Sequence, residues 1–449
     1  MKIKYKHQLY MGSISDMKSL EEHFSKMAER GWMIDKIGAV NHRYRAAEPC
    51  KKRFFVDLLP SIGTFDYPDN DDAKSYRQIC EESGWTFISA NGQFHVFCAE
   101  GDENEITPIH TDNKIQAKLH IKAIVKFELL TYIYCLVMFS IFAFLQFRFT
   151  GYDIYLSNMA IFSLFGWMFF LLGVLWSLTF VLVRIFKLAK AAKEDLPMPK
   201  ISYRSAKART GVQLTLFAIA ITFFFGGMVL EIAGGMSLAI ISPSLACIVG
   251  TFVGFWIRRQ INTKERTRKQ NRNLFIGAMA IMVVVLMVLS VFSMYLIFTL
   301  EENAAKPVKL PVITLSDVTE AMTPNNTYYD VFGSIAVPLH YSYGETTNKS
   351  DLSMEVFRPI NKKIAQDLFN HYAKMIESDD EMTYFHLGTR EAALWGADVA
   401  VETAYGSNVG LLLMRDKTIL RVWFCNECIE QEAVQQAVQS FWLELALVK

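Results

Sequence analysis

Five long apolar stretches without an ionisable side chain constrain this chain most strongly. About 20 apolar residues in a helix cross the hydrocarbon core of a bilayer, because within lipid the backbone must satisfy its own hydrogen bonds. Only 20% of the residues are charged and 52% are hydrophobic, whereas about 25% are charged in a typical soluble domain. We therefore predict a bundle of five transmembrane helices within residues 114–300, spanning about Leu129–Phe147, Met159–Val183, Gly211–Leu230, Met236–Ile257 and Leu274–Leu300.

Basic residues gather in two of the loops between these stretches. The loops after the second and fourth stretches carry many Lys and Arg residues, while the other two loops hold only Arg148 as a cation. Because short loops rich in Lys and Arg stay on the cytoplasmic side, residues 1–113 are expected to be cytoplasmic and residues 301–449 extracytoplasmic. The rule, with some contact between the basic loops and anionic lipid headgroups, accounts for the cations in these loops. The expected location is a bacterial cytoplasmic membrane, with the bilayer itself as the first partner.

The first 113 residues contain an internal repeat. Gly31-Trp32 recurs 53 residues later as Gly84-Trp85, and each pair follows a segment with helical periodicity. Glycine takes the left-handed conformation that ends a helix, and the Trp behind it is placed to pack on the last turn, so both pairs are expected to be structural anchors. With strands around each helix, the expected order is β-α-β-β-α-β, which is an α+β ferredoxin-like domain.

These residues also carry a resemblance to a known family. Ala28-x-x-Gly31-Trp32, Tyr76 through Gly84-Trp85, Glu48-Pro49 and Thr111-Asp112 resemble the bacterial membrane proteins of the domain of unknown function (DUF) 2812 family, over about residues 1–115. The resemblance implies a regulated membrane component, and it supplies no functional residues because the activity of that family is unknown.

The membrane region shows no transport signature. The five stretches contain no ionisable residue in mid-bilayer, where pumps and carriers place one. Glu128 and Glu231 lie at the edges of stretches one and three and are expected to snorkel or to be solvated. Gly250 and Gly254 form a GxxxG pattern, which allows close helix packing. That pattern leaves two interpretations open, packing between stretches three and four and self-association into a homo-oligomer.

The last 149 residues have the composition of a soluble α+β domain. Tyr329–Tyr343 is expected to be a strand, Ile360–Glu377 a helix, and Gly410–Met414 with Ile419–Phe424 a hairpin. Cys425 and Cys428 form a CxxC motif. A local structural disulfide suits an oxidising exterior, while unpaired thiols and redox or metal chemistry remain alternatives.

No motif predicts a catalytic, cofactor-binding or metal site. The sequence contains no P-loop, HExxH, GxSxG or kinase signature. The N-terminal domain is acidic and lacks an RNA-binding motif, so no nucleic-acid partner is expected. His42 and His95 are expected on opposite sheet edges, too far apart to share a metal.

The expected function therefore follows from architecture. We expect that the protein is not an enzyme and binds no cofactor. We expect instead a sensor, scaffold or accessory regulatory protein that couples an extracytoplasmic domain to a protein partner in the membrane or cytoplasm. A permease or transporter subunit is one alternative, and an extracytoplasmic thiol-disulfide protein is a second.

Overall fold

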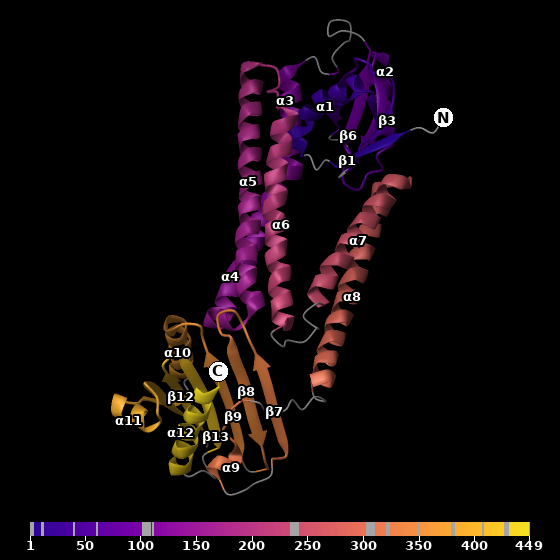
Figure 1. The fold of residues 1–449 in the computed structure, drawn as a ribbon. Coiled ribbons are helices and arrows are strands. Elements are labelled where there is room, and N and C mark those ends of the chain that lie inside the picture. Colours follow the sequence, from indigo (N-terminus) through magenta and orange to yellow (C-terminus); the bar gives the residue numbers. More distant parts are fainter. Residues whose placement is uncertain are drawn as a thin grey trace. The chain divides into compact units, whose positions relative to one another are not determined.

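Figure 1 shows the fold of the protein in a computed structural model, which describes residues 4–9, 13–38, 41–59, 62–100, 109, 112–233, 242–301, 310–319, 324–348, 350–378, 382–405, 408–425 and 431–448. The chain divides into two compact units, each described by itself below. The first unit comprises Met1–Phe142, Trp167–Ala220 and Pro243–Leu289, and the second comprises Ala143–Gly166, Ile221–Ser242 and Ser290–Lys449.

The N-terminal domain consists of two successive βαββ repeats. Its elements are β1 (Tyr5–Leu9), the 3-10 turn η1 (Ile14–Asp16), α1 (Met17–Glu29), β2 (Trp32–Lys36), β3 (Asn41–Ala46), β4 (Arg53–Leu58), α2 (Asp71–Glu82), β5 (Thr86–Asn91) and β6 (Phe94–Ala99). They form two antiparallel three-stranded sheets, with the orders β1-β3-β2 and β4-β6-β5. The same arrangement in both halves follows from the repeat in the sequence.

This topology differs from the predicted ferredoxin-like order. The segment after each Gly-Trp pair forms a two-stranded hairpin, so each repeat gains one strand and closes its own sheet. In the second repeat the chain reverses at Gly92, whose φ of +59° is accessible to glycine at little cost. The histidine prediction also changes, because His42 and His95 lie buried on the central strands β3 and β6 and not at sheet edges.

The Gly-Trp pairs lie at the ends of α1 and α2. Gly31 and Gly84 have φ angles of +80° and +87°, in the left-handed region. The N–H of Trp85 donates to the carbonyl of Cys80 and that of Gly84 to Glu81, which together form a Schellman cap. At the start of α2, Asn70 is the N-cap, and its side chain accepts a hydrogen bond from the N–H of Ala73 at 2.9 Å.

A single main core joins the two repeats. Helix α1 packs on β4 of the second sheet as well as on β2, and the cluster includes Phe24, Tyr44, Phe54 and Val96. Trp85 packs on Phe55 in a smaller cluster, with ring centroids 5.6 Å apart. The domain is therefore one body.

Long apolar helices follow the N-terminal domain. They are α3 (Asn113–Ile124), the π-helical turn η2 (Val125–Leu129), α4 (Leu130–Thr150), the 3-10 segment η3 (Gly151–Leu156), α5 (Asn158–Glu194), α6 (Tyr203–Ala233), α7 (Ser242–Thr263) and α8 (Arg268–Glu301). Within the described residues, four helical stretches are long and apolar enough to cross a membrane: Asn113–Arg148, Asn158–Glu194, Tyr203–Ala233 and Arg268–Phe292. The protein is thus a multi-pass membrane protein. The fourth predicted span, Met236–Ile257, begins at residues outside the described ranges.

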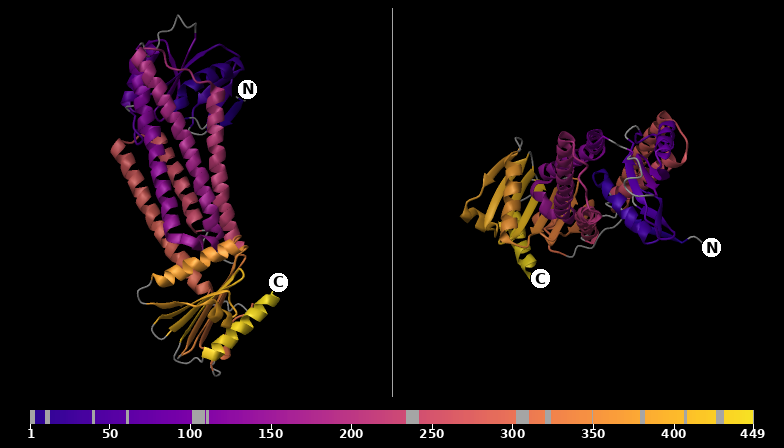
Figure 2. Two further views of the ribbon diagram at one scale, coloured as in Figure 1. Left: turned by 90° about the vertical axis from the view of Figure 1, so that its left-hand side faces the viewer. Right: turned by 90° about the horizontal axis from the view of Figure 1, so that it is seen from above.

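The C-terminal domain is a seven-stranded antiparallel sheet between two helical layers. Its elements are α9 (Leu315–Val318), β7 (Asn326–Phe332), β8 (Leu339–Thr346), β9 (Asp351–Arg358), α10 (Lys362–Glu377), β10 (Thr383–His386), α11 (Thr389–Leu394), β11 (Val399–Tyr405), β12 (Asn408–Arg415), β13 (Thr418–Cys425) and α12 (Gln431–Leu447). The sheet order is β10-β11-β12-β13-β9-β8-β7. Figure 2 shows this sheet with α10 in orange on one face and α12 in yellow on the other.

Alternation along the strands explains the two layers. In β12, Leu411 and Leu413 face the core beneath α12, whereas Leu412 and Met414 face the core beneath α10. The predicted hairpin β12–β13 and the helix α10 are present. The segment Tyr329–Tyr343, expected to be one strand, instead supplies parts of two antiparallel strands, β7 and β8.

Candidate functional site

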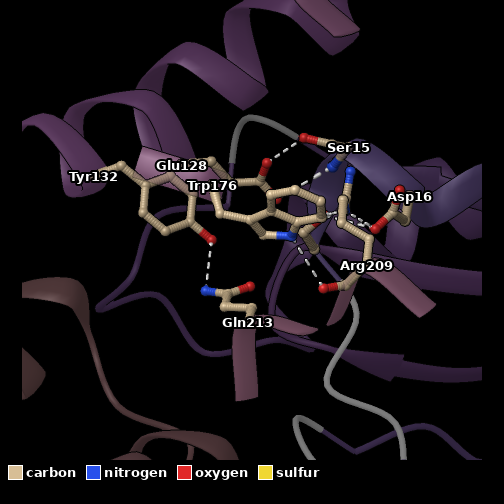
Figure 3. A network of polar contacts seen from close by, with 8 residues as sticks. Ser15, Asp16, Glu128, Tyr132, Trp176, Arg209 and Gln213 are labelled. Atoms are coloured by element: carbon tan, nitrogen blue, oxygen red, sulfur yellow. Dashed lines mark hydrogen bonds and ion pairs between the residues drawn. The ribbon is translucent and has the colours of Figure 1, made fainter. Parts of the chain in front are cut away.

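A buried polar cluster joins the N-terminal domain to the ends of the long helices. Its members are Ser13, Ser15 and Asp16 from the chain before α1, Glu128 from η2, and Arg209 from α6. Figure 3 labels Ser15, Asp16, Glu128 and Arg209 of this cluster. We call these five residues the N-terminal junction. It lies entirely within the first compact unit.

Glu128 is buried in this junction, with 8% of its surface exposed. Its carboxylate accepts hydrogen bonds from the backbone N–H of Ser15, at 3.2 Å, and from the Ser15 hydroxyl. The residue lies in a π-helical turn, in which the N–H of Leu130 bonds to the carbonyl of Val125. The prediction that Glu128 snorkels or is solvated is therefore wrong, because Ser15 shields its carboxylate and satisfies its oxygens.

Asp16 and Arg209 form a buried ion pair. The Asp16 side chain is 1% exposed and that of Arg209 is 14% exposed. The Arg209 guanidinium donates to the Asp16 carboxylate and to the Ser13 hydroxyl, the latter at 2.8 Å. It also lies over the Phe180 ring, 5.4 Å from the centroid. Asp16 occupies the N-cap position of α1, yet its side chain makes no cap hydrogen bond and instead pairs with Arg209.

Polar groups of the helices continue the cluster away from the N-terminal domain. The Trp176 indole N–H donates to the backbone carbonyl of Arg209 at 3.4 Å, and the Gln213 amide donates to the Tyr132 hydroxyl at 3.5 Å. A cavity of about 360 Å³ is lined by Glu128, Tyr132, Gln213 and Arg209, among others. A water-sized or small polar molecule fits this space, next to the buried carboxylate.

A second contact to α6 lies nearby. The Tyr203 ring stacks on His23, with centroids 3.8 Å apart, and its hydroxyl accepts a hydrogen bond from Gln8 at 2.8 Å. Burial lowers the pKa of His23 to about 4, so this ring is neutral at pH 7. The contact is therefore aromatic stacking between neutral rings, unlike the ion pair beside it.

The C-terminal domain has its own contacts with helix ends, within the second compact unit. The Tyr372 hydroxyl of α10 donates to the carboxylate of Asp153 in η3 at 3.1 Å. Asn158, at the start of α5, donates to the carbonyl of Gly333 at 3.0 Å and accepts from the N–H of Ile335 at 2.9 Å. We call these five residues the C-terminal junction.

Glu231 is also buried, contrary to the expectation that it snorkels or is solvated. It is 6% exposed, and its carboxylate accepts the N–H of Met159 at 3.0 Å. That N–H belongs to the first turn of α5, where donors lack a partner within the helix. Glu231 therefore caps α5 from α6.

The structure does not bring the residues singled out in the sequence together at the junctions. Gly31, Trp32, Gly84 and Trp85 lie within the N-terminal domain. A Cβ atom at Gly250 would meet the sulfur of Met282 in α8 at 3.4 Å, and one at Gly254 would meet nothing within 4 Å. Of the candidate disulfide, Cys428 lies outside the described residues, as does the side chain of Cys425.

Sequence reasoning missed the junction because its partners are far apart along the chain. Ser15 and Glu128 are 113 residues apart, and Asp16 and Arg209 are 193 apart. One signal was present, since Glu128 is the only acidic residue between Asp112 and Asp153. Among the described residues, no group of three or more His, Cys, Asp or Glu side chains could hold a metal ion.

The comparisons with known proteins concern mainly this part of the chain. Neither the curated proteins nor the solved structures contain a match to the sequence. One family model matches residues 16–133, a range that includes both Asp16 and Glu128 of the junction and ends in the first turn of α4. Residues 16–133 thus match the family described as protein of unknown function (DUF2812), which confirms the resemblance found in the sequence.

Proposed function

We propose that this protein is a membrane-embedded regulatory protein that couples an extracytoplasmic C-terminal domain to a cytoplasmic N-terminal domain, which binds a protein partner. In this proposal five helices span a bacterial cytoplasmic membrane. They are the four candidate membrane-spanning stretches described above and α7 as a fifth span. The basic residues of segments 184–209 and 258–272 lie at helix ends and in the linkers between them, and in this proposal both segments are on the cytoplasmic side, as the positive-inside rule requires.

One observation carries the proposal, namely that the chain is fastened to a different folded domain near each of the two ends of α4. Glu128, in the turn before α4, is bound by Ser15 of the N-terminal domain. Asp153, in the segment after α4, is bound by Tyr372 of the C-terminal domain. A displacement of one domain therefore acts on the same helix that holds the other, which gives the two domains a contiguous physical connection.

Hydrogen exchange in the full-length protein in lipid nanodiscs tests this coupling. The variant Asp153→Asn weakens the contact to Tyr372, and we expect faster exchange at the amide of Ser15, which donates to Glu128. Asp351→Asn, at an exposed position on β9, is the matched control and should leave that exchange unchanged. Identical exchange at Ser15 in the Asp153 variant and the control would contradict the coupling.

Crosslinking in the native membrane tests the partner. A stoichiometric protein partner, identified by mass spectrometry and recovered less well with Glu128→Ala, supports the proposal. Flux of an ion or solute through proteoliposomes that contain only this protein would instead favour the permease alternative.

Orientation has a separate test, in a background without the native cysteines. Glu432→Cys should react with a membrane-impermeant thiol reagent on intact cells, whereas Lys36→Cys should react only after lysis, since both positions are exposed. The reverse pattern would overturn the orientation.

A further inference from the structure

A second cavity, of about 170 Å³, lies where α5 ends and α6 begins. Its lining comes from the last turns of α5, the linker that follows, and the first turns of α6. The charged side chains that line it are four cations and one carboxylate: Arg184, Lys187, Lys200, Arg209 and Asp16. The carboxylate is already bound by Arg209. The remaining charge in the cavity is therefore strongly positive.

Arg184 is the residue of this cavity whose charge and hydrogen-bond donors are only partly compensated. It is 5% exposed, and its one hydrogen bond to a described residue runs from Nη1 to the backbone carbonyl of Pro199 at 2.8 Å. Within the described part of the chain its Nε has no hydrogen-bond partner, and no carboxylate forms an ion pair with it. Burial of a charge costs free energy unless an opposite charge and hydrogen bonds compensate for it. Arg184 therefore lacks an anion, which the cavity beside it has room to hold.

Two lysines supply further donors to the same space. Lys187 and Lys200 line the cavity from α5 and from the linker, both are exposed, and neither forms an ion pair with a described residue. A planar guanidinium and two ammonium groups together offer many donors to one anion with several oxygens, and phosphate groups are bound in this way.

The position of the cavity along α5 indicates which kind of phosphate-bearing molecule can reach it. Arg184 directly follows the apolar stretch that ends at Val183, and Val183 itself lines the cavity and is 45% exposed. Leu182 and Phe186 are 49% and 73% exposed on the same turns. In a membrane protein such apolar surface faces lipid, so the cations lie at headgroup depth.

We propose that this cavity binds the phosphate group of an anionic phospholipid, with Arg184, Lys187 and Lys200 as its ligands. The positive-inside rule accounts for the number of cations in this loop, but it does not require a buried arginine without a carboxylate. The proposal does not depend on the coupling function proposed above, because it concerns equilibrium binding at one site.

Native mass spectrometry of the delipidated full-length protein in detergent tests the proposal. Phosphatidylglycerol is titrated against phosphatidylcholine, and we expect one tightly retained phosphatidylglycerol in the unmodified protein. The double variant Lys187→Gln/Lys200→Gln should weaken the retention of phosphatidylglycerol by about tenfold or more, because each lysine near a lipid phosphate contributes about 1 kcal/mol of binding free energy. Arg184→Gln should weaken it as well.

The matched control is Lys190→Gln/Lys193→Gln, which removes the same charge from exposed positions of α5 that do not line the cavity. Its effect should stay below about twofold. An equal loss in the control would overturn the proposal, because it would show general surface attraction. The lysine variant keeps Arg184, so the test holds even if Arg184→Gln fails to fold.

Inorganic phosphate distinguishes the two sources of the group. If millimolar inorganic phosphate displaces phosphatidylglycerol, and Lys187→Gln/Lys200→Gln abolishes this competition, the cavity is a phosphate site whose ligand is a soluble phosphate compound. If phosphatidylglycerol is retained in the presence of inorganic phosphate, the ligand is the lipid. Binding of neither probe would overturn the site.

Discussion

The two junctions fasten folded domains to helix ends by different chemistry. The N-terminal junction uses a buried ion pair, Asp16 with Arg209, and a second carboxylate at Glu128. The C-terminal junction relies on the amide of Asn158 and the phenol of Tyr372. A buried charge that loses its partner costs about 3–5 kcal/mol, while a lost hydrogen bond between neutral groups costs about 1–3 kcal/mol. The N-terminal contacts are therefore expected to break as a unit and the C-terminal contacts one at a time.

The largest effect should come from Arg209→Gln. The variant leaves the Asp16 carboxylate buried without its cation, and we expect a loss of about 4 kcal/mol in the free energy of unfolding. Denaturant titration in detergent micelles measures this loss. Arg204→Gln, an exposed arginine of the same helix, should change the stability by less than about 0.5 kcal/mol.

A second substitution shows whether the charge is the cause. Asp16→Asn in the Arg209→Gln background removes the unpaired carboxylate and should restore most of the lost stability. If the double variant is as unstable as Arg209→Gln, the comparison of the junctions is wrong.

Acid should weaken the N-terminal domain next. Arg77 can only donate, so Nε2 of His95, 3.2 Å away, accepts, and the proton lies on Nδ1 facing the Gln93 carbonyl at 3.3 Å. Burial lowers the pKa of His95 to about 4 from an ordinary value of 6.5. The unfolded chain therefore binds the proton first as the pH falls. Stability is complete above pH 6.5 and declines from there, by about 3 kcal/mol at pH 4.

Hydrogen exchange in the full-length protein measures this decline at residues 94–99. Protection of β6, corrected for the intrinsic rate, should fall between pH 6.5 and 4, and His95→Gln should make that fall shallower. The helix α12, which contains no histidine, provides a reference within the same sample. An unchanged slope in the histidine variant would assign the pH dependence to other groups.

Asn158→Ala should produce a smaller loss, of about 2 kcal/mol. The side chain is 4% exposed, and its removal leaves the Gly333 carbonyl and the Ile335 N–H without partners. The same denaturant titration checks the value, with the exposed Asn326→Ala as control. A loss as large as that of Arg209→Gln would remove the difference between the junctions.

Tyr372→Phe should have the smallest effect, about 1 kcal/mol, because it deletes one hydrogen bond to Asp153 and keeps the ring. Tyr384→Phe at an exposed position on β10 is the control. No difference between the two variants would show that the Tyr372 hydroxyl contributes nothing to the C-terminal junction.

Local patterns in the sequence predicted local structure well. The apolar stretches indicated the four candidate spans, and the DUF2812 resemblance is confirmed over residues 16–133. The positions of Gly31 and Gly84 indicated where α1 and α2 end, since a left-handed residue is encoded at the position itself. Two strand-like apolar runs separated by the short segment Arg415-Asp416-Lys417 likewise indicated the β12–β13 hairpin.

Contacts between distant segments could not be predicted in this way. The order β1-β3-β2 depends on whether the chain reverses after Lys36, and the order β4-β6-β5 depends on a second reversal at Gly92, so two turns changed the topology of the N-terminal domain. Asp16 shows the same limit at one residue. Its position suggests a helix cap. Only the fold reveals that the Asp16 carboxylate binds Arg209 and not the N–H groups of α1.

The π-helical turn from Val125 to Leu129 sets the rotational phase of the first membrane helix. A π turn holds one residue more than an α turn, so every side chain after Leu129 points about 100° away from where an unbroken helix from Asn113 would aim it. Glu128 sits inside that turn. The carboxylate that holds Ser15 thus also belongs to the five residues that decide which face of α4 meets lipid and which meets its neighbouring helices.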